Sequence, residues 1–199
     1  MQEKTKWSNV KSYSVSDIDE GIRRSIKSSL DWLDSAYLLL SSGKKNQAFI
    51  NYTFAVEEFG KALLLNDRKK EAISKGWKMI SNDDITFRDH DAKIKRAEAE
   101  LKDPAIGISL IDESKIPIFD LNPSIDQILA FTDVREFPSK GKFLSFENRI
   151  SLMYVDYDTN KQEWRDIEYF IPRVTMEVGF DAFKNEVKDW QSDFEKGLK

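Results

Sequence analysis

Residues 55–65, AVEEFGKALLL, decide the fold class of this chain. In a strand the adjacent side chains of Glu57 and Glu58 would point to opposite faces, and the flanking apolar residues keep no period of two. At about 100° per residue, the apolar residues instead form one stripe of a helix. The stripe consists of Ala48, Tyr52, Ala55, Phe59, Ala62 and Leu63. The stretch therefore predicts an amphipathic helix that ends in the region of Asp67.

Helical spacing recurs on both sides of this segment. Apolar residues at three- and four-residue steps predict a preceding helix, from a cap at Ser16 or Asp17 to a stop at Gly43. The short connection makes these two helices an antiparallel hairpin. Residues 71–82 predict a weaker helical piece, and another helix begins after the Asn/Asp cluster of residues 82–84. Its face carries Ile94, Ala97 and Leu101.

The second half of the chain predicts further helices around an irregular segment. Helical patterns cover residues 124–137, 143–157 and about 173–198, with a turn at residues 158–161. Residues 104–123 contain three of the five prolines and no sustained period, so we expect an irregular crossover there. The fold class is an all-α antiparallel helical bundle. We expect a single domain over residues 1–199, with its core at about 17–165.

Composition excludes several classes of site. The chain has no cysteine, which removes disulfides, thiolate ligands and a cysteine nucleophile, and His90 is its only histidine. A carboxylate-bundle metal enzyme would need Glu-x-x-His on two helices, so we expect neither a metal nor a cofactor. A net charge of -4 gives no general attraction to nucleic acid. The polar first residues predict no membrane segment and no secretion signal, and we expect a cytoplasmic protein.

The polar residues within the apolar helix are the first candidate site. Glu58 is expected at the edge of the apolar stripe and Glu57 further away, with Lys61 placed to pair with either. Gly60 lacks a side chain and permits a neighbouring helix to approach closely. We expect partly buried charge here, since apolar residues surround it. An ordinary surface ion pair is the alternative.

The later polar residues add two smaller patterns. His90 and Lys93 share one helix face, and His90 with Glu58 would form an acid–base pair, although a lone histidine beside an apolar stripe is more often structural. Arg149 and Tyr154 lie five residues apart, roughly 140° around a regular helix. They converge only where the helix ends, bulges or kinks.

Three segments together resemble the AbiV family of bacterial abortive-infection proteins, a branch of the HEPN superfamily. They are AVEEFGKALLL, FRDHDAKIK at residues 87–95 and NRISLMYVDY at residues 148–157, and the resemblance covers roughly residues 20–165. It implies a HEPN-like bundle that dimerises, and in many such proteins a metal-independent endoribonuclease. It also implies one cleft formed by Glu58, Lys61, His90, Lys93 and Arg149.

This sequence departs from the usual HEPN signature at one position. Arg149 fits its arginine, but Tyr154 stands where a histidine is expected four to six residues later. A tyrosine, with an ordinary pKa near 10, is a poor base at neutral pH. RNA cleavage would then require His90 or Glu58 to substitute, and whether the protein is an enzyme stays open. The candidate catalytic residues are Glu58, His90, Arg149 and Tyr154, with Lys61 and Lys93 as candidate phosphate or RNA ligands.

Two functions follow from the resemblance and the polar residues. The first is an anti-phage effector that arrests the infected cell by acting on RNA or translation, as a homodimer triggered by a phage-encoded protein. The alternative is a non-catalytic helical module whose polar cluster is structural and whose residues 104–123, or aromatic-rich late region, bind a protein partner.

Overall fold

The computed structural model describes residues 12–81, 89–103, 106, 156–158, 163–165 and 173–197. In this part the helices are α1 (Val15–Ser41), α2 (Lys45–Lys75), α3 (His90–Glu100) and α6 (Arg173–Glu195). The strands are β1 (Ser12–Ser14), β2 (Met79–Ser81), β3 (Asp156–Asp158) and β4 (Glu163–Arg165), paired antiparallel as β1 with β2 and β3 with β4. Helices dominate and the strands form only short ribbons, which confirms the all-α class.

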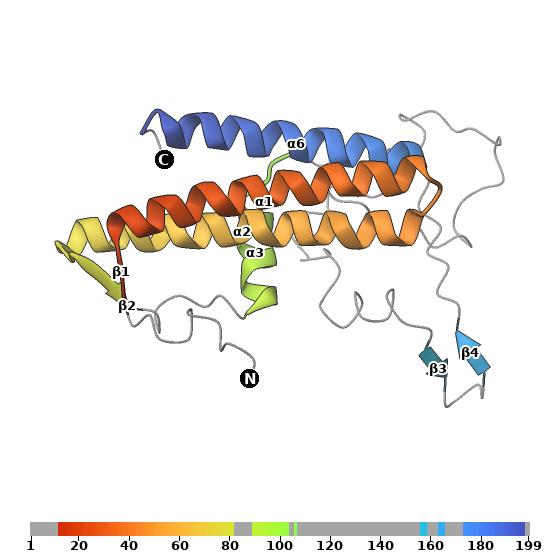
Figure 1. The fold of residues 1–199 in the computed structure, drawn as a ribbon, viewed down its shortest axis with the longest axis horizontal. Helices are drawn as coiled ribbons and strands as arrows, with labels where there is room; N and C mark the ends of the chain where they lie inside the picture. The colour runs from red at the N-terminus through yellow and green to blue at the C-terminus, as the bar shows by residue number, and fades with distance from the viewer. Residues whose placement is uncertain are drawn as a thin grey trace, which may run out of the picture.

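The first two helices form the predicted antiparallel hairpin (Figure 1). The hydroxyl of Ser14 accepts a hydrogen bond from the Asp17 backbone, and the Asp17 carboxylate accepts one from the Ser14 backbone. This capping box starts α1 at Val15, so the predicted cap at Ser16 or Asp17 is wrong by a few residues. Between the helices, the buried Ser29 hydroxyl donates to the Ala55 carbonyl at 2.7 Å.

The second helix is longer than the sequence pattern indicated. It continues to Lys75 and ends at Gly76, whose φ of 67° is left-handed. The predicted end near Asp67 is therefore wrong, and the weaker piece at residues 71–82 is the last turn of α2 followed by β2. Ion pairs of Glu71 with Arg68 and Lys75 explain the difference, because they stabilise this charged stretch as a solvated helix face.

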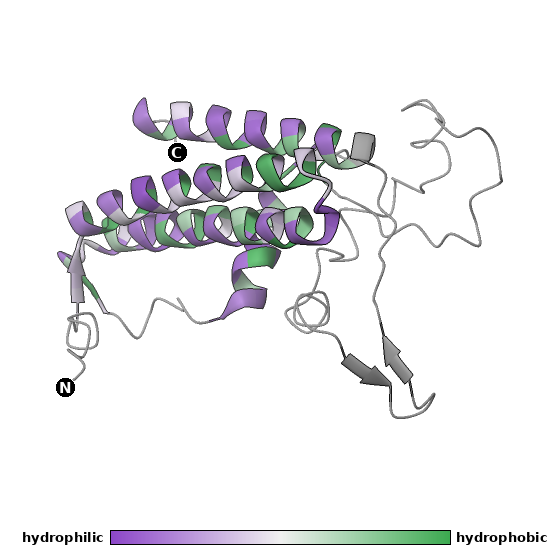
Figure 2. Cartoon of the chain, turned by 45° about the vertical axis from the view of Figure 1, so that its right-hand side comes forward, coloured by the Kyte–Doolittle hydropathy of each residue, from purple (hydrophilic) through white to green (hydrophobic). Residues whose placement is uncertain are grey.

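The core lies between the hairpin and α6, which runs alongside α1 (Figure 1). The Tyr52 ring stacks on Phe180 with centroids 4.8 Å apart, and Phe59 makes edge contacts with Phe183 and Trp190, each at 5.9 Å. Figure 2 shows hydrophilic residues on the outer side of α6 and apolar residues on the side toward α1 and α2. The apolar stripe of α2 thus faces the core between α1 and α6.

Several sequence predictions fall beyond the described residues. These include the helix at 124–137, most of the helix at 143–157 and all of the crossover except Ile106, whose carbonyl accepts the Tyr52 hydroxyl at 2.8 Å. The end of the helix predicted at 143–157 is wrong, because Tyr157 belongs to β3 and pairs with Trp164 of β4. No helix in the described ranges is long and apolar enough to cross a membrane.

Candidate functional site

Helix α3 packs its first turn against α2. The Asp89 carboxylate accepts the Ala92 backbone N–H at 2.9 Å and caps the helix, so α3 starts at His90 rather than after the cluster at residues 82–84. At Gly60 the α3 backbone is so close that a Cβ there would lie 1.8 Å from the Lys93 carbonyl oxygen. This confirms the predicted role of Gly60 as the point of close approach.

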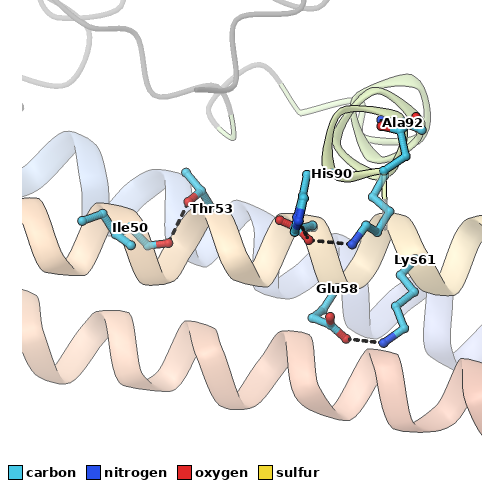
Figure 3. Close-up of polar contacts among 9 residues, drawn as sticks. Ile50, Thr53, Glu58, Lys61, His90 and Ala92 are labelled. Atoms are coloured by element: carbon cyan, nitrogen blue, oxygen red, sulfur yellow. Dashed lines mark hydrogen bonds and ion pairs between the residues drawn. The ribbon is translucent and has the colours of Figure 1, made fainter. Parts of the chain in front are cut away.

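One buried carboxylate holds both polar side chains of this first turn. Glu57 Oε1 accepts a hydrogen bond from Lys93 Nζ at 2.7 Å and lies 2.6 Å from His90 Nδ1 (Figure 3). The side chains of Glu57 and Lys93 are only 7% and 5% exposed, whereas that of His90 is 42% exposed. We call these three residues the Glu57 cluster.

The choice between the two glutamates is the main correction to the sequence prediction. His90 pairs with Glu57 and not with Glu58, and Glu57 is buried rather than turned away. Glu58 bonds Lys61 Nζ at 3.2 Å along the same helix (Figure 3). The reason is that α3 covers the flank of α2 that carries Glu57 and Gly60, while the apolar stripe faces α1 and α6.

A sequence signal for Glu57 did exist. Glu57 and Gly60 are three residues apart, so they share one side of a helix. An element that packs closely at Gly60 therefore covers Glu57 more readily than Glu58. The position of Gly60 therefore favours Glu57 as the buried carboxylate, whereas the angle of each glutamate to the apolar stripe favours Glu58.

The protonation state of the cluster follows from its donors. A lysine ammonium can only donate, so Lys93 donates to Oε1 and stabilises the ionised form of Glu57. An ionised carboxylate can only accept, so its bond with His90 needs a proton on Nδ1. The ring nitrogen not engaged by Glu57 is Nε2. This arrangement suits a general acid or base that is oriented by a carboxylate.

A second polar contact joins the same two helices further along. Arg96 donates to both carboxylate oxygens of Asp67, at 2.6 and 3.2 Å, and to Glu100 at 3.0 Å. The hydrogen bond that Arg96 donates to Asp67, followed by the one it donates to Glu100, raises the pKa of Arg96 above its ordinary value. This contact fixes α3 on α2 without touching His90.

The structure brings together only part of the predicted cleft. His90 and Lys93 meet at Glu57, and Glu58 and Lys61 form a partly exposed pair on α2. Arg149 and Tyr154 lie outside the described residues, and their place in the cleft stays a prediction. Among the residues that are described, no group of three or more histidines and carboxylates is placed to hold a metal ion.

The fold and the site define a helical bundle with a buried ionic cluster where two of its helices meet. The family model HEPN_AbiV, described as AbiV, matches residues 17–172, which is most of the chain. The chain therefore belongs to the AbiV family of the HEPN superfamily, which is a family of abortive-infection type. No curated protein and no solved structure matches it. Helix α6 lies beyond the matched residues although it completes the core.

Proposed function

We propose that the protein is an anti-phage effector that arrests the growth of the infected cell by acting on RNA or on translation. Membership of the AbiV family supports the role in abortive infection. The observation that carries a chemical role is His90, a partly exposed imidazole bonded through Nδ1 to a buried carboxylate.

RNA cleavage is the chemistry that this arrangement fits best. A base is needed at the ribose 2′-hydroxyl and a cation at the scissile phosphate. His90 is the only imidazole in the chain, and a tyrosine is a poor base at neutral pH. His90 is therefore the proposed base, in place of Tyr154 at the histidine position of the HEPN signature. Lys61, with a 30% exposed side chain, and Arg149 are the proposed phosphate ligands. Lys93, also predicted as a phosphate ligand, is 5% exposed and donates to Glu57, so it is not among them. Local contacts of this kind are compatible with a net charge of -4.

A cell-free translation extract tests this proposal. Purified protein should arrest translation, and His90→Ala and Arg149→Ala should each relieve the arrest. Lys27→Ala is the control, because Lys27 is exposed on α1 and pairs only with the exposed Asp31 in the described contacts. Full arrest by His90→Ala would remove the Glu57 cluster from the mechanism.

Exposed apolar residues favour a second candidate, a non-catalytic protein-binding module. Ile73, Trp77 and Met79, at the end of α2 and the start of β2, are 60%, 43% and 50% exposed. Labelled RNA incubated with the protein without metal separates the two candidates. Products that end in a 2′,3′-cyclic phosphate support cleavage, whereas intact RNA alongside arrested translation supports binding.

The trigger and the oligomeric state are part of the same proposal. An effector that stops translation must stay silent in the uninfected cell, so we propose a phage-encoded protein as its trigger. Co-expression with single phage genes should reveal toxicity with one of them, and toxicity of the protein alone at native levels would contradict this. Sedimentation tests the proposed homodimer.

A further inference from the structure

We propose that Glu57 is a positioning residue that keeps the neutral ring of His90 in its Nδ1–H tautomer, so that His90 acts on its target through Nε2. The action on a target rests on the function proposed above. The tautomer is a property of the folded chain and can be measured without any activity. Nothing in the family match assigns this role to Glu57.

The first step of the argument is the shared oxygen. Both Lys93 Nζ and His90 Nδ1 lie within 2.7 Å of Glu57 Oε1. Lys93 has no acceptor, so its bond fixes this oxygen as the acceptor and holds the carboxylate in place. A histidine in water prefers the Nε2–H tautomer, and the hydrogen bond made by one ring nitrogen decides which tautomer a folded protein contains. Here that bond is to Nδ1.

The second step is that the cluster is poorly explained as a clamp between helices. The pair of Arg96 and Asp67 already joins α3 to α2, and the backbone contact at Gly60 fixes their distance. Burying a charged pair contributes little stability compared with apolar side chains of similar volume. A buried carboxylate bonded to a partly exposed imidazole does, however, orient that imidazole.

The single histidine makes the test direct. Nuclear magnetic resonance of the full chain with ¹⁵N-labelled histidine gives the two ring nitrogens of His90 and no others. At a pH where the ring is neutral, we expect a protonated Nδ1 and an unprotonated Nε2. Glu57→Leu combined with Lys93→Met removes both charges at similar volume and should shift the ring to Nε2–H. It should also reduce translation arrest at least tenfold.

The matched control is Asp67→Leu combined with Arg96→Met, which removes the other ion pair between the same helices. We expect its His90 ring to remain in the Nδ1–H form, because this variant weakens the docking of α3 but leaves Glu57 in place. A change of tautomer in the first double variant then comes from the loss of Glu57 and not from a looser α3. Should the first double variant fail to fold, Glu57→Asp keeps a carboxylate opposite Lys93 while drawing it back from the ring. That variant should also lose the preference for Nδ1–H.

The outcomes separate the two proposals. An Nε2–H ring in the unaltered protein, or an unchanged ring in folded Glu57 variants, overturns the positioning role whatever the protein does to translation. If a Glu57 variant has the Nε2–H tautomer and still arrests translation fully, His90 does not act on its target through Nε2. If the unaltered protein does not arrest translation, the proposed function fails, and the tautomer measurement still decides the role of Glu57.

Discussion

Replacing Gly60 with alanine tests the contact that builds the site. The new Cβ would lie 1.8 Å from the Lys93 carbonyl oxygen, whereas real Cβ atoms stay at least 3.0 Å from such neighbours, so α3 must retreat by about 1.2 Å. The obstacle is backbone, which cannot rotate aside as a side chain can. A movement of this size pulls Lys93 and His90 away from Glu57, to which they lie at 2.7 and 2.6 Å.

The expected cost follows from two opposing effects. Separating a buried ion pair costs about 3–5 kcal/mol, and alanine in place of a mid-helix glycine returns about 1 kcal/mol. The net loss of unfolding free energy is about 2–4 kcal/mol. For a chain of this length, that lowers Tm by roughly 4–16 °C. Calorimetry and urea denaturation measure both quantities, and the translation assay should show loss of arrest.

Gly21→Ala in α1 is the matched control. A Cβ at Gly21 would lie 3.3 Å from a methyl carbon of the buried Leu65 side chain, which must shift by a few tenths of an ångström. This variant should lose far less stability than Gly60→Ala, because the obstacle is one side-chain methyl rather than backbone and helix propensity returns up to about 1 kcal/mol. If Gly60→Ala were equally stable and kept the Nδ1–H ring of His90, the close approach of α3 would not be what holds the cluster together.

Three further predictions concern the bundle around the site. Ser14→Ala removes the cap of α1 and should cost about 1 kcal/mol in urea denaturation; an unchanged midpoint would contradict this. Hydrogen bonds from Ser14 lower the pKa of Asp17 below its ordinary 3.8, so the stability it contributes is complete above that value and is lost as the pH falls through the lowered pKa. The Tm of Asp17→Asn should therefore fall less on acidification than the Tm of the unaltered protein. Phe183→Ala should cost about 3–5 kcal/mol because the ring is buried against Phe59, whereas the adjacent Lys184→Ala, which removes an exposed pair, should cost under about 1 kcal/mol. Similar losses for both would mean that α6 is not packed into the core.

Helix identity could be predicted from the sequence because it depends on local spacing. The apolar stripe of α2 and the pattern that begins at Val174 needed only neighbours three and four residues apart. Helix ends depend on more than local spacing. The charged residues around Arg68 could stop a helix or line its solvated face, and only the pairs that Glu71 makes distinguish the two.

The choice of Glu57 over Glu58 needed the tertiary structure. The sequence determined that both carboxylates lie on one helix, that Gly60 permits a close neighbour and that His90 is the only imidazole. An apolar stripe shows which side of a helix faces the core, here toward α1 and α6, but does not locate a further neighbour on its flank. Only the docking of α3 decided which carboxylate was buried, because burial and ionic pairing depend on contacts between residues more than thirty positions apart.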